Sequence, residues 1–154
     1  MILPILQRPC TERFAKAIDL FNVHQRFDDG DFKAPVKYPF HRSCYGKHTC
    51  MWGVIRLAKG LLFIPVCSRT AAASRLLNRC IDSILLHEVC FASHDKKRLI
   101  HRAVDTITFP SVARGDFLEV LWIPAREGIK HPKIKRALHM LESKMTADGQ
   151  WTLE

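Results

Sequence analysis

Apolar residues recur along this chain mostly at intervals of three and four positions, the spacing that gathers side chains on one face of an α-helix. The pattern predicts five helices, at about residues 11–25, 46–64, 69–89, 115–123 and 132–147. No stretch shows the sustained period of two that a half-buried strand requires. We therefore expect an all-α protein in which helices are joined by turns and loops.

Residues that begin and end helices stand at the expected places. Thr11 can cap the first helix, and Ser68 or Thr70 can cap the third. Pro65 stops the second helix, and Pro132 stands near the start of the last one, where proline is tolerated. Residues 30–46 contain two prolines and two glycines and are predicted to be a long loop.

Composition and length place the chain among ordinary globular proteins. With 154 residues, 47% of them hydrophobic and 25% charged, we expect one domain spanning residues 1–154. The longest apolar stretch, residues 54–66, is interrupted by Arg56, Lys59 and Pro65, so no membrane span is predicted. The N-terminus lacks the basic region of a secretory signal, so we expect a cytoplasmic protein whose six cysteines are core thiols rather than disulfides.

The formal charge of +9 raises the question of nucleic-acid binding. The basic residues are dispersed, and the densest runs, at residues 96–102 and 130–136, contain no aromatics between the basic side chains. A solvated basic face explains this distribution better than a nucleic-acid interface. Nucleic-acid binding is thus kept only as a third function hypothesis.

Residues 136–151, RALHMLESKMTADGQW, end in a glycine and a tryptophan two positions apart. This segment resembles the QW repeat of squalene and oxidosqualene cyclases, with Met140 and Met145 in place of the aromatic and the glutamine of that motif. A second, weaker copy begins at residue 16 and contains Gln25 and Gly30.

In physical terms the motif lets the chain turn at a glycine and returns an aromatic ring to its hairpin. For Gly149 and Trp151 we therefore expect a structural role. By analogy with other large aromatic truncations, Trp151→Ala should cost about 3 kcal/mol or more.

Residues 43–53, SCYGKHTCMWG, resemble helix-start segments of the terpenoid-cyclase and prenyltransferase superfamily. The resemblance implies an α/α toroid of helical hairpins around an apolar cavity. At roughly 40–50 residues per helical repeat, the chain holds about three hairpins, half of a full ring. It also implies a second copy or another partner that completes the ring.

Four zinc-compatible residues lie within ten positions, in the spacing His41-x-x-Cys44-x-x-x-His48-x-Cys50. In the prenyltransferases that the segment resembles, zinc is catalytic and activates a substrate thiol. The aspartate that completes the zinc site in that family has no counterpart here. A core thiol at Cys50 and an ordinary helix-start histidine at His48 are the alternative, so zinc is only a candidate cofactor.

The remaining candidates concern an apolar ligand. Trp52 and Trp122 stand on apolar helix faces, where they fill the core or line a ligand cavity. No acid comparable to the Asp-rich motif of cyclases is present, so cyclisation chemistry is not expected. The sequence therefore favours a toroid-family module that binds an apolar, isoprenoid-like ligand or a protein partner. The alternative is a zinc-dependent, prenyltransferase-like enzyme.

Overall fold

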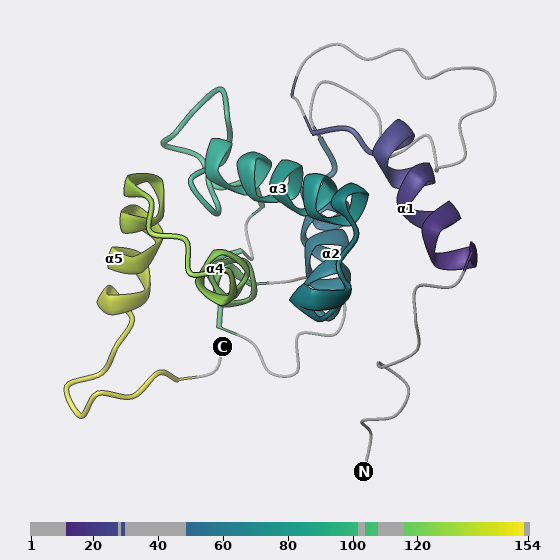
Figure 1. Ribbon diagram of the computed structural model, residues 1–154. Coiled ribbons are helices and arrows are strands. Elements are labelled where there is room, and N and C mark those ends of the chain that lie inside the picture. The colour runs from purple at the N-terminus through teal and green to yellow at the C-terminus, as the bar shows by residue number, and fades with distance from the viewer. Residues whose placement is uncertain (1–11, 28, 30–48, 102–103, 108–115, 153–154) are drawn as a thin grey trace. The chain divides into compact units, whose positions relative to one another are not determined.

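The structure, a computed structural model, describes residues 12–27, 29, 49–101, 104–107 and 116–152 (Figure 1). This part contains five α-helices: α1 (Glu12–His24), α2 (Met51–Leu62), α3 (Ala71–Leu86), α4 (Phe117–Arg126) and α5 (Lys135–Ser143). Two short 3-10 helices, η2 (Val66–Ser68) and η3 (Pro132–Ile134), precede α3 and α5. The described residues form no strand, only an isolated antiparallel bridge between Phe91 and Leu99. Within the described residues, the expectation of an all-α fold class is confirmed.

The chain forms two compact units, residues 1–80 and 81–154, and the boundary falls within α3. In the first unit, most of the buried apolar side chains come from α2 and from the first part of α3. They are Met51, Val54, Ile55, Ala58, Leu61, Leu62, Ala73, Leu76, Leu77 and Cys80. Thr70 caps α3, because its Oγ1 accepts a hydrogen bond from the backbone N–H of Ala73 at 3.2 Å.

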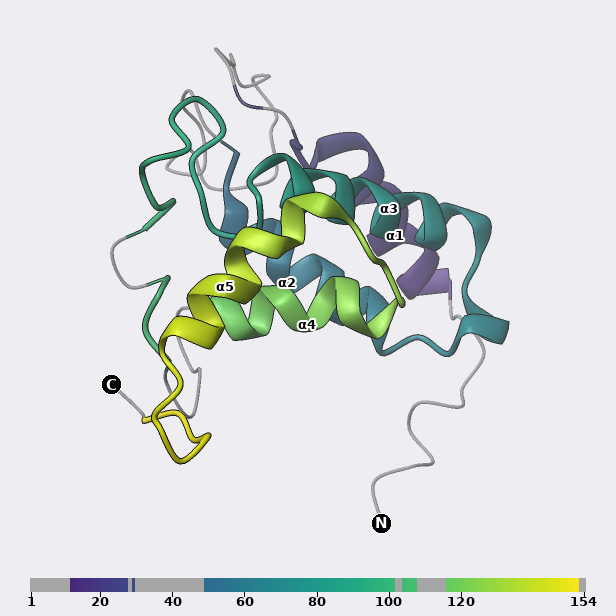
Figure 2. The same ribbon diagram turned by 90° about the vertical axis from the view of Figure 1, so that its left-hand side faces the viewer.

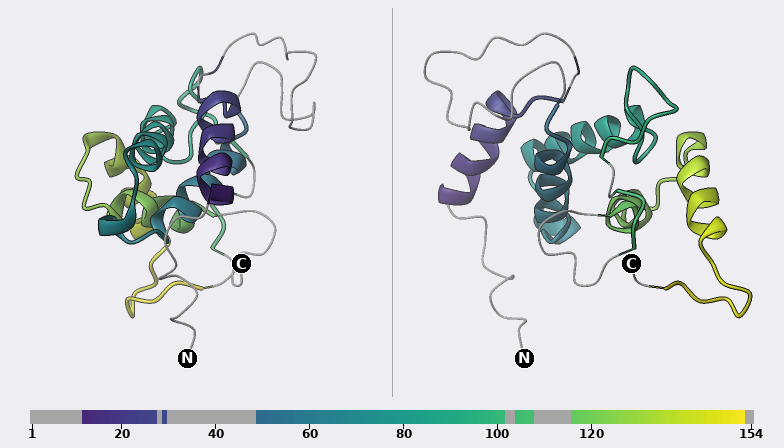
Figure 3. Two further views of the ribbon diagram at one scale, coloured as in Figure 1. Left: turned by 45° about the vertical axis from the view of Figure 1, so that its right-hand side comes forward. Right: turned by 180° about the vertical axis from the view of Figure 1, so that it is seen from behind.

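Helix α1 contributes little to this core, since Ile18 is its one fully buried residue. Polar contacts hold its end instead. Asn22 Nδ2 donates to the carbonyl of Ala72 at 3.5 Å, and Arg79 Nη1 donates to the carbonyl of Asn22 at 2.9 Å. The Arg79 guanidinium also lies 4.3 Å from the centre of the Phe27 ring. These contacts fasten the C-terminal end of α1, which lies beside α2 (Figure 3). Several of its apolar side chains, Phe14, Leu20 and Val23, stay exposed.

In the second unit, α4 and α5 form a helical hairpin (Figure 2). Asp116 caps α4 by accepting a hydrogen bond from the N–H of Glu119 at 2.9 Å. Gly128, with φ +68°, ends the helix, and the N–H of Ile129 donates to the carbonyl of Pro124 at 2.9 Å. The buried apolar residues of this unit include Ile84, Val89, Phe91, Val104, Phe117, Val120, Ile123, Ile134 and Ala137.

The C-terminal end of α3 turns sharply with two non-glycine residues at positive φ, Glu88 (+45°) and Val89 (+77°). Such a conformation costs of order 1–3 kcal/mol for each residue and persists only where surrounding contacts hold it. The Glu88 carboxylate lies 4.0 Å from Lys96 Nζ and 3.7 Å from Arg136 Nη1. The Val89 side chain is fully buried. Charge pairing and burial together hold this turn.

Helix boundaries differ from the sequence prediction at several ends. The last helix stops at Ser143 rather than near residue 147, because residues 144–151 form a separate turn. The fourth helix extends to Arg126 with Pro124 inside it, and the third stops at Leu86. Of residues 46–64, the expected second helix, residues 51–62 are helical, and residues 46–48 lie outside the described part.

The described cysteines are Cys50, Cys67, Cys80 and Cys90, and all four are free thiols. Burial raises the pKa of Cys80 and of Cys90 to about 12. These two are core thiols, as expected. Cys67 is exposed, so the core-thiol expectation is wrong at that position, where η2 carries it on the surface. Within the described part, no helix is both long and apolar enough to cross a membrane.

Candidate functional site

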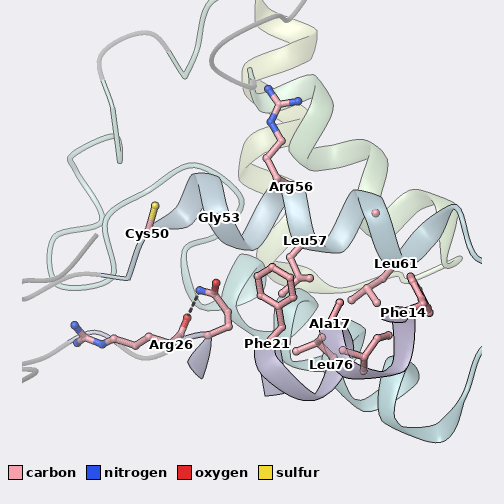
Figure 4. Close-up of a pocket in the computed structure, with 13 residues that line it drawn as sticks. Phe14, Ala17, Phe21, Arg26, Cys50, Gly53, Arg56, Leu57, Leu61 and Leu76 are labelled. Atoms are coloured by element: carbon pink, nitrogen blue, oxygen red, sulfur yellow. Dashed lines mark hydrogen bonds between the residues drawn. The ribbon is translucent and has the colours of Figure 1, made fainter. Parts of the chain in front are cut away.

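A cavity of about 540 Å³ lies between α1 and α2 in the first unit (Figure 4). Most of its lining is apolar. The lining residues are Phe14, Ala17, Ile18, Phe21, Gln25, Arg26, Cys50, Gly53, Arg56, Leu57, Gly60, Leu61 and Leu76. Its volume falls within the range of about 300–1,000 Å³ typical of small-molecule sites.

Small residues on the facing helices explain why this space is not filled. Helix α2 presents Gly53, Leu57 and Gly60 toward the cavity, at the i, i+4 and i+7 spacing of one helix face. Nothing lies within 4 Å of the point where a Cβ of Gly60 would stand. On α1, Ala17 stands between Phe14 and Phe21. Side chains of α1 and α2 point into the gap without closing it (Figure 4).

Polar groups gather at the end of the cavity where α1 ends and α2 begins. Gln25 Nε2 donates a hydrogen bond to the Arg26 carbonyl at 2.7 Å. A Cβ at Gly53 would lie 3.6 Å from Gln25 Oε1 and 3.7 Å from Cys50 Sγ, so the amide and the thiol both face this glycine. The Arg56 side chain extends away from α1 (Figure 4). The cavity thus has an apolar body and one polar end.

The described lining of this cavity offers a mostly hydrophobic wall and one nucleophile, the thiol of Cys50. Among its described residues it holds no histidine, aspartate or glutamate. Such a wall is suited to holding an apolar molecule.

The zinc hypothesis can be placed only in part. Cys50 lines the polar end of the cavity, whereas His41, Cys44 and His48 lie outside the described residues. Among the residues that the structure describes, no three histidine, cysteine or acidic side chains are grouped so as to hold a metal ion. Zinc binding by the 41–50 segment stays a prediction.

The candidate tryptophans are found in different surroundings. Trp52 lies in α2, partly buried, and is not among the residues that line the cavity. Trp122, in α4, is 40% exposed and lines a separate hollow on the α4–α5 hairpin. Of the residues of the weaker repeat copy, Gln25 lines the cavity and Gly30 lies outside the described part.

The C-terminal motif forms a local turn that returns to α5. Gly149 adopts φ +78°, a conformation that glycine takes without strain. Trp151 Nε1 then donates a hydrogen bond at 2.8 Å to the carbonyl of Leu141, in the last turn of α5, which also accepts a bond from the N–H of Lys144 at 3.2 Å. Thr146 supports the turn, since its N–H donates to the Gln150 carbonyl at 2.8 Å. The ring of Trp151 is 42% exposed.

Sequence reasoning did not single out the residues that create the cavity, Ala17, Gly53 and Gly60. A signal was present, because a glycine inside a helix costs roughly 0.5–1 kcal/mol relative to alanine. Two of them seven positions apart fall on one face of a helix. Such a pair indicates that something must approach or fit against that face.

Comparisons of the chain with protein-family models, with curated proteins and with solved structures find no match. The resemblance to cyclases and prenyltransferases therefore remains a hypothesis that depends on the motifs quoted above.

Proposed function

We propose that this protein binds an elongated apolar small molecule, isoprenoid-like in shape, in the cavity between α1 and α2. The observation that supports the proposal is a cavity of about 540 Å³ whose described wall is apolar along most of its length. Burying apolar ligand surface there is favourable by about 25 cal/mol per Å² removed from water. Ligand binding also compensates for the loose packing of α1, because the ligand supplies contacts that the two helices lack.

The polar end of the cavity indicates the form of the ligand. Gln25 presents an amide oxygen there, and Cys50 presents a thiol, so a hydroxyl group has partners with which to form hydrogen bonds. The rest of the ligand meets aromatic and aliphatic side chains. A chain alcohol with branched apolar carbons fits this arrangement, and farnesol is a suitable probe.

Calorimetric titration with farnesol tests the proposal. We expect saturable binding with one molecule per chain and a negative heat-capacity change, the mark of apolar burial. Leu57→Gln should weaken it at least tenfold, because the substitution places a polar group in the cavity wall.

The matched control is Phe63→Gln, which makes a similar change at a side chain that is 58% exposed and outside the cavity. It should leave the affinity unchanged. No saturable binding, or equal losses in the two variants, would contradict the proposal.

A zinc-dependent transferase is the second candidate function, and the placement of Cys50 at the cavity favours it. In such an enzyme Cys50 would be one of the zinc ligands, and a substrate thiol bound to the same zinc would lose its proton and displace a leaving group from an apolar molecule held in the cavity. Metal analysis of the purified protein should then show stoichiometric zinc that Cys50→Ser removes. Cys67→Ser, at an exposed thiol, is the control. If the purified protein contains no zinc and still binds farnesol, the transferase is contradicted and the binding proposal stands.

We also propose that the helices form about half of an α/α toroid, which a second copy or another partner completes. The support is the repeat-like C-terminal motif and the apolar surface left exposed on terminal helices, at Phe14 and Leu138. Ile18 of α1 and Ile134 of η3 are buried within their own units and so add nothing to this exposed surface. Sedimentation velocity tests the idea, and a monomer at high micromolar concentration would contradict self-association.

A further inference from the structure

A second concave surface lies on the α4–α5 hairpin and forms one continuous groove. It consists of two adjoining hollows of about 500 and 370 Å³, which share Ile129, Ile134 and Leu138. The first hollow is otherwise lined by Leu118, Leu121, Trp122, Pro124, Ala125 and Leu141. The second is completed by Lys130, His131, Pro132 and Lys135. The groove is separate from the cavity between α1 and α2 and belongs wholly to the second unit.

Large apolar side chains stand exposed at this groove. Trp122 is 40% exposed and Leu138 is 43% exposed, whereas Ile134, which lines both hollows, is buried. Tryptophan is among the residue types that dominate binding energy at protein interfaces. Trp122 lines the first hollow and Leu138 lines both hollows. A longer apolar surface laid along the groove would cover them.

The groove is mostly apolar along its length and carries two lysines at one end. Lys130 and Lys135 line the second hollow, and both residues are exposed. Among the described residues, no carboxylate lines either hollow. An occupant that presents apolar side chains to the first hollow therefore meets two lysines at the second. Carboxylates on that part of the occupant would complement the charge.

We propose that the α4–α5 groove docks an amphipathic helix of another protein whose apolar face carries acidic residues at one end. A helix fits a hydrophobic groove through side chains at i, i+3 or i+4 and i+7, and these can enter the two hollows in succession. A membrane surface is flat and fills a concave groove poorly. A second copy of this chain is a poor match, because no described helix has more acidic than basic residues.

The probe is a synthetic helical peptide of about 18 residues with leucines along one face and glutamates at one end of that face. Fluorescence anisotropy measures its binding to the full chain. One control peptide has lysine in place of each glutamate, and the other has the same composition in scrambled order. The acidic amphipathic peptide should bind at least tenfold more tightly than either control, with an affinity that falls as salt rises.

Variants of the groove separate its apolar part from its charged part. Trp122→Ala should lower the affinity for the acidic peptide about thirtyfold, the loss typical of an interface hot spot. The double variant Lys130→Glu with Lys135→Glu should lower the affinity for the acidic peptide at least tenfold and raise the affinity for the lysine peptide. The matched control, Lys97→Glu with Arg98→Glu, changes two exposed basic residues of the same unit outside the groove and should change neither affinity.

Other occupants give different results. Binding of phosphatidylserine vesicles that is lost in Trp122→Ala, together with no preference for the acidic peptide, would overturn the proposal in favour of a membrane surface. Self-association that Trp122→Ala abolishes, with no peptide binding, would overturn it in favour of a second copy. Thermal melts of each variant exclude unfolding as the cause of a loss. Weakening by the control substitutions equal to that of the groove substitutions would also refute the assignment.

Discussion

Gly60→Leu is the sharpest perturbation that the cavity between α1 and α2 offers. Gly60 lies inside α2, lines the cavity, and has no atom within 4 Å of its Cβ position. Replacing a helix-interior glycine should stabilise the protein by roughly 0.5–1 kcal/mol through the unfolded chain and helix propensity. The added side chain occupies space that the ligand would use.

The expected loss of affinity follows from the volume taken. Leucine adds about four carbon groups, and each buried carbon group is worth about 0.8 kcal/mol of apolar burial to the ligand. The binding free energy of the ligand therefore falls by about 3 kcal/mol, which lowers the affinity for farnesol about a hundredfold. Gly60→Ala adds one carbon and should lower the affinity for farnesol only about fourfold. Its gain in stability from helix propensity should be similar to that of Gly60→Leu.

Calorimetric titration of the two variants measures the loss of affinity for farnesol, and thermal melts measure the gain in stability. A stabilised Gly60→Leu protein that binds farnesol as tightly as the original chain would show that the ligand lies elsewhere. Destabilisation by more than about 1 kcal/mol would show that the space at Gly60 is not open, so that a ligand could not use it.

Three further predictions concern stability. The thiols of Cys80 and Cys90, whose folded pKa is raised from 9.0 to about 12, contribute stability that is fully present below about pH 9 and lost as the pH rises toward 12. Ionisation of each thiol in the unfolded chain should lower the free energy of unfolding by about 1.4 kcal/mol per pH unit in that range. Cys80→Ala should reduce the slope of the free energy of unfolding against pH, measured by urea titration, and Cys67→Ala should not. Trp151→Ala should cost about 2 kcal/mol in a denaturant melt, less than the motif alone suggests, because the ring is 42% exposed and its hydrogen bond is worth about 1 kcal/mol. Thr70→Ala should cost about 1 kcal/mol by the same assay, because it removes the side-chain cap of α3, and Thr70→Ser should restore it.

The helices were predictable because their apolar stripes and their end signals agree. In α3, Leu76, Leu77, Cys80, Ile81 and Ile84 follow the helical period, and all five are buried. The ends were less predictable. Glu88 takes the left-handed conformation usually given to glycine, and salt bridges and burial that come from distant positions hold it there. Local sequence carries no trace of those contacts.

The candidate site was predictable only in fragments. Gln25 and Cys50 were chosen for a repeat motif and for zinc, and both line the cavity. The cavity itself arises from small residues on two helices separated by a long connection, and sequence spacing does not show which helices face each other. The groove at Trp122 was missed for the same reason, since it depends on how α4 and α5 pack after the turn at Gly128.

An isotope-filtered NMR experiment on the full chain, with methyl-labelled leucine and unlabelled farnesol, locates the bound ligand directly. If farnesol occupies the cavity between α1 and α2, we expect intermolecular contacts from the ligand to the methyl groups of Leu57, Leu61 and Leu76, which line it. Contacts confined to Leu121 and Leu138 of the α4–α5 groove, or no contacts at saturating farnesol, would contradict it.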